Sequence, residues 1–299
     1  MSLPRQIIPG RTYLVTRRCA QRQLLLRPSP LVNRIFLYCL AVAAHRHGIL
    51  VHAYCALSNH WHVVVTDPHG KLPEFVHWLD LYVAKCINAA LGRWESVWSS
   101  GSYSAVHLVG LDDVLAKAAY TLANPVAAGL VAEGWQWPGA RGGTEGRGQR
   151  VSVRRPHVFF RAGTSLPTEA VLEIAEPPGW EAEQRDPFCR AVTHAVEALE
   201  QQSRATLSAE GRSFLGRRQV LAQSPHEVPR TREARRALRP RVACKDKWRR
   251  IETLSRLKEF VRAYREAWRQ WRAGVREVLF PAGTYALHLH AGVRVVEMT

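Results

Sequence analysis

The sequence has no Cys-x-x-Cys pair, no long hydrophobic run and few acidic residues for its many basic ones. Its six cysteines are scattered over 299 residues, which argues against a zinc ribbon or a disulfide framework and favours reduced thiols. The longest apolar run, Ile35 to Ala44, is far shorter than the roughly 20 residues of a membrane span, and the N-terminus has no apolar signal core. We therefore expect a soluble, cytoplasmic protein with no membrane partner.

The shortage of acidic residues leaves a net charge of +17, from 42 Lys and Arg against 25 Asp and Glu. Such a field attracts phosphate backbones. Nucleic acid is favoured over an anionic membrane surface, because no basic amphipathic segment is joined to an apolar anchor. The chain also has no G-x-x-x-x-G-K-[ST] loop, so ATP-driven chemistry is not expected. These features predict a nucleoid-associated protein.

Residues 1–138 alternate strand-like and helix-like segments, as expected of one α+β domain. The order β-α-β-β-α-β-α is the ferredoxin-like split βαβ plan, with an antiparallel sheet. The third helix should end at about Ala123 or Asn124, because a proline follows. The predicted strands cover 11–17, 50–56, 61–66 and 102–108, and the predicted helices cover 31–47, 74–91 and 112–123.

Residues 139–150 are rich in glycine and arginine and are predicted to be a linker. Residues 151–299 form a basic, mostly helical extension, with a long helix over 248–278 and a short hairpin over 280–296. The excess positive charge is concentrated in one segment, since residues 212–250 alone hold 13 basic and 3 acidic residues. This distribution favours a DNA-contacting surface over general solubility.

His60 and His62 stand at the start of a β-prone run, Leu57-Ser58-Asn59-His60-Trp61-His62-Val63-Val64-Val65. Alternate residues of a strand share a face, with Cα atoms about 7 Å apart, so these two imidazoles could share a metal ion. The same spacing at His288 and His290 shows that spacing alone does not identify a site, since a His-x-His pair is often structural.

Tyr120 and Asn124 lie four residues apart and should share one face of a helix. They could supply a nucleophile and a further ligand, or be a core tyrosine with an asparagine helix stop. Tyrosine is a poor nucleophile at its usual pKa near 10. Attack on a phosphodiester would need a metal that polarises the phosphate, a role that the histidine pair could support.

These motifs carry a resemblance to a known family. The segment from Asn59 to Val65 resembles the N-H-x-H-x-h-h pattern (h apolar) of single-tyrosine HUH transposases. Residues 120–131 resemble the Y-I-x-x-N-P-V-x-A-G-L-V signature of their REP-associated branch, with Thr121 in place of the usual isoleucine. Residues 98–103 also resemble an aromatic and glycine segment of that family. The resemblance covers residues 11–132.

The resemblance implies a mechanism. His60, His62 and Asn124 would hold Mg²⁺ or Mn²⁺ at the scissile phosphate of single-stranded DNA with a neighbouring hairpin. Tyr120 would attack, leaving a 5′-phosphotyrosine and a free 3′-OH, and reversal would join strands without external energy. The protein would act as a monomer or homodimer. The basic residues expected to contact DNA are Arg17, Arg18, Arg235, Arg236, Arg249 and Arg250.

Two alternatives remain at the level of sequence. A domesticated relative could recognise hairpin DNA or RNA without cutting it, since the sheet plan is shared with modules that bind single strands. A zinc hydrolase could use His60, His62 and a carboxylate such as Asp67, although zinc normally takes three protein ligands and no spacing nominates the third convincingly.

Overall fold

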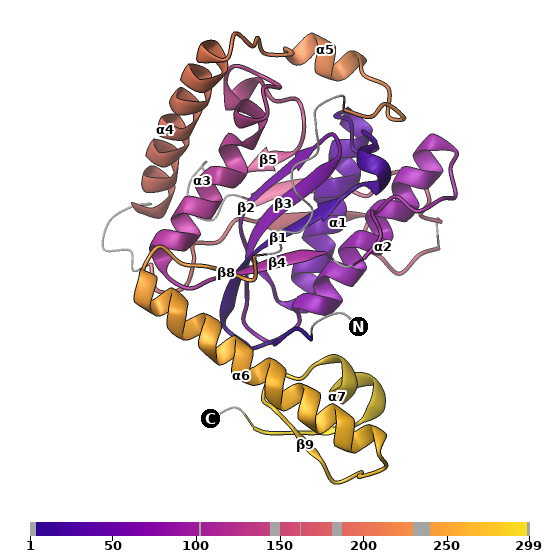
Figure 1. Ribbon diagram of the computed structural model, residues 1–299. Helices are drawn as coiled ribbons and strands as arrows, with labels where there is room; N and C mark the ends of the chain where they lie inside the picture. The colour runs from indigo at the N-terminus through magenta and orange to yellow at the C-terminus, as the bar shows by residue number, and fades with distance from the viewer. Residues whose placement is uncertain are drawn as a thin grey trace.

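The protein is an α+β structure built on a six-stranded, mostly antiparallel sheet (Figure 1). The computed structural model describes residues 4–101, 103–143, 150–161, 163–180, 187–229 and 240–297. In spatial order the strands are β5 (Arg141–Gly142), β2 (Leu50–Leu57), β3 (His60–Asp67), β1 (Arg11–Arg18), β4 (Ser104–Leu108) and β8 (Val242–Ala243). Only the short β8 pairs in parallel, with β4.

Helices cover both faces of the sheet (Figure 1). On one face lie α1 (Pro30–His47) and α2 (Leu72–Leu91), and on the other lies α3 (Leu111–Ala127), with α4 (Pro187–Ala209) packed against it. The alternation along β3 matches these two layers, because Trp61 and Val63 join the α1 and α2 core whereas Val64 joins the α3 and α4 core. The predicted order of the first seven elements is confirmed.

The central hairpin sets the register of the site. Strands β2 and β3 are joined by a tight turn at Ser58 and Asn59, and their pairing begins with Leu57 opposite His60. On its other edge β3 pairs with β1, which places Thr16 opposite His62 and Arg18 opposite His60. Residues directly opposite in an antiparallel pair share a face, so these four side chains lie together on the α3 side.

The predicted end of α3 at Ala123 or Asn124 is wrong. The helix continues to Ala127 with Pro125 inside its last turn. Pro125 removes one backbone donor but its carbonyl still accepts from Leu130 N, and the Asn124 carbonyl accepts from Ala128 N. A following proline only disfavours the α conformation, and burial of Val126 in a core cluster with Val131 offsets that cost. Asn124 is therefore a helical residue.

The glycine-rich segment is partly ordered into the sheet. Arg141–Gly142 forms the edge strand β5 against β2, although residues 139–150 were predicted to be a linker. Residues 144–149 lie outside the described part of the chain. A Cβ at Gly142 would lie only 2.6 Å from the Tyr54 hydroxyl, so the missing side chain is what allows the two strands to approach. The domain boundaries remain predictions.

Elements after residue 150 share the core with those before it. Phe188, Val192 and Val196 of α4 are buried against α3, and Leu172 joins the cluster around α1. Two short 3-10 helices, η1 (Ala20–Arg22) and η2 (Gly134–Gln136), lie earlier in the chain. The remaining elements are β6 (Arg150–Arg154), β7 (Glu169–Glu173), α5 (Arg217–Ala222), α6 (Lys247–Arg272), β9 (Leu279–Phe280), α7 (Ala286–Ala291) and β10 (Arg294–Val295).

The predicted C-terminal hairpin is also wrong. Strands β9 and β10 pair in parallel, and α7 connects them. His288 and His290 therefore lie on a short helix, where residues two apart do not share a face. His288 Nδ1 lies 2.9 Å from the Val293 carbonyl oxygen, within hydrogen-bond distance. In the described residues, no helix combines the length and the apolar character needed to cross a membrane.

Candidate functional site

The two histidines of β3 lie side by side on the face of the sheet that α3 covers. Their ring centroids are 4.8 Å apart and their planes are nearly perpendicular, at 87°. This arrangement results from the alternation of side chains along β3. Val64, on the same face, packs under α3, so His62 and His60 point to that face as well. The expected juxtaposition of the two imidazoles is therefore present.

The tautomer of His60 is set by its neighbour. The Asn59 amide nitrogen donates to the Arg22 carbonyl at 3.4 Å, so its Oδ1 faces the imidazole and lies 2.7 Å from His60 Nδ1. An amide oxygen only accepts, so His60 Nδ1 must carry the proton. In the neutral ring this leaves the lone pair on Nε2. Metal-binding histidines are commonly held in this way through the other ring nitrogen.

His62 is held from the adjacent strand. Its Nδ1 shares a hydrogen bond of 2.7 Å with Thr16 Oγ1, across the pairing of β1 with β3. The other nitrogen, Nε2, is buried and has no hydrogen-bond partner among the residues that the structure describes. A buried polar atom without a partner is costly. The His62 ring lies beside His60 and Tyr120, so its Nε2 is available to bind a ligand such as a metal ion.

Tyr120 approaches this pair from α3. Its ring centroid lies 5.6 Å from that of His62, and 41% of its surface is exposed. Asn124, one helical turn further on the same face, is 8% exposed. The structure thus brings His60, His62 and Tyr120 together, with Asn124 on the next turn. The buried-core interpretation of Tyr120 does not fit, because its side chain reaches solvent.

Both imidazoles are neutral near pH 7. Burial, with a smaller contribution from the charge of Arg18, lowers the pKa of His60 to about 4. Burial also lowers the pKa of His62 well below its ordinary value, with further contributions from His60, Arg18 and Lys117. Neutral imidazole is the form that binds a metal ion.

Three residues that shape this site were not given their roles from the sequence. Asn59 orients His60, Thr16 orients His62, and the Lys117 ammonium lies 5.4 Å from the Tyr120 ring centroid. Lys117 could have been found, since it stands three residues before Tyr120 on the same helical face. Thr16 could not, because only the strand register places it opposite His62.

The predicted DNA-contacting arginines have different surroundings. Arg18 is exposed beside His60, whereas the Arg17 guanidinium lies 3.1 Å from Asp80 and is largely buried. Arg249 and Arg250 begin α6, and Arg249 reaches the Val109 carbonyl near the start of α3, away from Tyr120. Arg235 and Arg236 lie outside the described residues.

The zinc-hydrolase alternative finds no support at this site. Across the residues that the structure describes, no three His, Cys, Asp or Glu side chains form a metal-binding group. Asp67 lies at the far end of β3 from His60, where its carboxylate accepts hydrogen bonds from Lys71 N and Leu72 N at the start of α2. Its role is to cap that helix.

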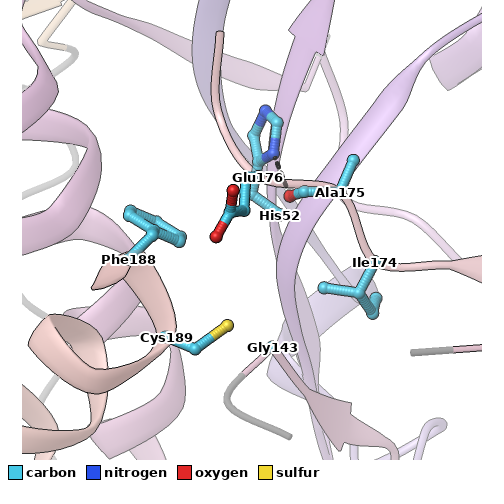
Figure 2. Close-up of a pocket in the computed structure, with 7 residues that line it drawn as sticks. All are labelled: His52, Gly143, Ile174, Ala175, Glu176, Phe188 and Cys189. Carbon is cyan, nitrogen blue, oxygen red and sulfur yellow. Dashed lines mark hydrogen bonds between the residues drawn. The ribbon is translucent and has the colours of Figure 1, made fainter. Parts of the chain in front are cut away.

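A small pocket elsewhere does not coincide with this site. Figure 2 shows it between β2, the segment after β7 and the start of α4, with His52 hydrogen-bonded to the Ala175 carbonyl oxygen. The other nitrogen of His52 bonds Thr66. The space is too narrow for a water molecule. This pocket is a packing feature of the core.

The chain resembles transposases in comparisons with solved structures. No protein-family model and no curated protein matches it. A REP-associated tyrosine transposase bound to a REP hairpin is similar over 46% of this chain and 80% of its own, with 18% identity and a TM-score of 0.39. A candidate transposase from Deinococcus radiodurans R1 is similar over 36% of this chain and 85% of its own, with 19% identity and a TM-score of 0.28. The resemblance to transposases that the sequence predicted is confirmed as a structural similarity. The functional proposal is based on the side-chain geometry of the site.

Proposed function

We propose that the protein is a metal-dependent DNA strand transferase, and in particular a single-tyrosine HUH transposase of the REP-associated kind. The observation that carries the proposal is the pair of neutral histidines, each held through Nδ1, beside the exposed Tyr120 on α3. The order of the first seven elements supports a ferredoxin-like split βαβ domain as the scaffold. All four proposed site residues come from one chain, so a single protomer could contain a complete site.

The residues fit a divalent cation such as Mg²⁺ or Mn²⁺. The Nε2 atoms of His60 and His62 are the ring nitrogens not engaged by Asn59 and Thr16, and within the described part of the chain the Nε2 of His62 has no partner. Asn124 would add an amide oxygen. Two imidazoles with an oxygen ligand suit several first-row metals, and water and phosphate would complete the shell. When bound, the metal would polarise the scissile phosphate and stabilise its developing charge.

Tyr120 is the nucleophile in this proposal. Its phenolic oxygen forms a bond to phosphorus while the bond from phosphorus to the 3′-oxygen breaks. The phenolic proton is released, and the leaving 3′-oxygen gains a proton to become a free 3′-OH. The product is a 5′-phosphotyrosine, and attack by another 3′-OH restores the phosphodiester and the tyrosine. Because the ester bond is conserved, no ATP is required.

The proposed substrate is single-stranded DNA next to a hairpin. Arg18 stands beside the site, where it can contact a phosphate. Further basic side chains lie on α6, which has Arg249 and Arg250 on its first turn and an exposed Trp248 beside them. Basic side chains next to exposed aromatic rings suit unpaired nucleic acid. We propose that this helix makes a second contact with the DNA.

The decisive experiment is adduct formation. The protein is incubated with labelled single-stranded hairpin DNA and Mg²⁺ or Mn²⁺, and a denaturation-resistant protein–DNA adduct is sought. We expect wild type to form the adduct, Tyr120→Phe to form none, and Tyr82→Phe, in the α2 aromatic cluster, to behave as wild type. The variant Tyr120→Phe should still bind the DNA, because only the nucleophilic oxygen is lost.

Two outcomes would contradict the proposal. An adduct that persists in Tyr120→Phe would mean that another residue is the nucleophile. Binding without any adduct in wild type, across a panel of hairpins and both metals, would favour the domesticated binding protein.

A further inference from the structure

Lys117 extends the site along α3. Lys117, Tyr120 and Asn124 stand at positions i, i+3 and i+7, which fall on one face of a helix. The Lys117 ammonium lies 5.4 Å from the Tyr120 ring centroid, and its charge lowers the pKa of His62. Lys117 is thus close to both the proposed nucleophile and the proposed metal ligands.

The ammonium group has no carboxylate partner within the described part of the chain. None of the ion pairs found there includes Lys117. The acidic residue one turn earlier, Asp113, is engaged elsewhere, since its carboxylate accepts from Gly110 N at 2.9 Å and from Lys245 N at 2.7 Å. The Asp113 carboxylate therefore caps α3 and does not pair with Lys117.

The charged side chains that lower the pKa values of the two imidazoles are both cationic: Arg18 from β1 and Lys117 from α3. Two cationic side chains beside two neutral imidazoles favour the binding of an anion, and a phosphodiester is an anion. A lysine ammonium is a compact point charge that binds phosphate oxygens well.

We propose that Lys117 is a catalytic residue whose ammonium donates a hydrogen bond to a nonbridging oxygen of the scissile phosphate as Tyr120 attacks. Negative charge on those oxygens is then stabilised by a group already in place. No proton transfer by Lys117 is required. The inference rests on the proposed strand-transfer function and adds a phosphate-binding group to it.

The test compares Lys117→Met with Lys85→Met. Lys85 is a matched control because its ammonium also lies over a tyrosine ring of its own helix, 5.8 Å from Tyr82, but in α2. Both substitutions remove one positive charge from the chain. The measurements are the single-turnover rate of adduct formation at saturating hairpin DNA and Mn²⁺, the Kd for the hairpin, and the affinity for Mn²⁺ without DNA.

We expect Lys117→Met to slow adduct formation about 100-fold, as for loss of one preorganised donor to a developing oxyanion. Lys85→Met should react at the wild-type rate, and Lys117→Arg should recover part of the loss. The hairpin Kd should change equally in the two methionine variants. Mn²⁺ affinity should not fall in Lys117→Met, because a cation beside His62 has been removed.

Three results would overturn the inference. Equal rates for Lys117→Met and Lys85→Met would leave the transposase proposal standing and remove the role of Lys117. Weaker binding with an unchanged rate at saturation would make Lys117 a general DNA contact. Absence of an adduct in wild type would overturn the proposed function, and this inference with it.

Discussion

Substitution of Thr16 tests the site through a residue that touches neither DNA nor metal. Thr16→Val keeps the shape of the side chain and removes the hydroxyl that lies 2.7 Å from His62 Nδ1. His62 would then be a buried imidazole with no fixed orientation. Loss of such an outer partner typically weakens metal affinity about 10- to 100-fold, or about 1.4 to 2.7 kcal/mol.

Thr12 provides a matched control on the same strand and face. Its hydroxyl also lies 2.7 Å from a β3 side chain, Thr66, at the other end of the strand from His60 and His62. Thr12→Val should cost about 0.5 to 1.5 kcal/mol of stability, because Thr66 keeps its second partner, His52. Thr16→Val should cost about 1 to 3 kcal/mol, since His62 loses the one hydrogen-bond partner that it has among the described residues.

The assay is the rate of adduct formation as a function of Mn²⁺ concentration, with Mn²⁺ binding to the free protein measured in parallel. Thr16→Val should need about 10 to 100 times more Mn²⁺ for half-maximal rate, and should reach a rate near that of wild type at saturation. Thr12→Val should require the wild-type concentration. If the two valine variants respond alike to Mn²⁺, Thr16 does not prepare His62 for a metal and the proposed site is wrong.

Two further predictions concern pH and salt. Burial lowers the pKa of His52 to about 4 from 6.5, so the unfolded chain takes up the proton first, and stability should fall as the pH is lowered from 6.5 to 4. Urea unfolding across this range should show a smaller fall for His52→Gln, and an unchanged pH dependence would contradict this. Binding of single-stranded hairpin DNA should weaken with salt, with log K falling about 0.7 per neutralised phosphate for each tenfold rise in salt. Replacing Arg249 and Arg250 together by Gln should reduce that slope by about 1.4; an unchanged slope would remove α6 from the interface.

Prediction from sequence succeeded where the pattern is local. The alternation along residues 61–66 and the stripe of residues 74–91 gave a strand and a helix at nearly the observed bounds. It failed where tertiary contacts oppose a local preference. Pro125 was expected to end α3, but the helix continues to Ala127 because its last turn is buried. Residues 139–150 were predicted to be a linker, but Arg141–Gly142 forms β5, and the missing side chain of Gly142 allows that strand to pack against Tyr54.

The histidine pairs show the same limit. His60 and His62 share a face because they lie on a strand, whereas His288 and His290, with the same spacing, lie on a helix. Spacing in the sequence could not distinguish these two pairs. What distinguishes them is the pairing of β3 with β1 and β2, in which β1 is a segment distant in sequence.

By itself the sequence determined the basic charge, the order of the first seven elements and the four residues of the candidate site. Those properties depend on composition and on periodicity within short segments. Tertiary structure decided that Tyr120 lies beside His62, that Thr16 and Asn59 orient the imidazoles, and that Lys117 is close to Tyr120 without an acidic partner in the described residues. These relations depend on strand register and on the docking of α3 across the sheet, which bring together residues up to about a hundred positions apart.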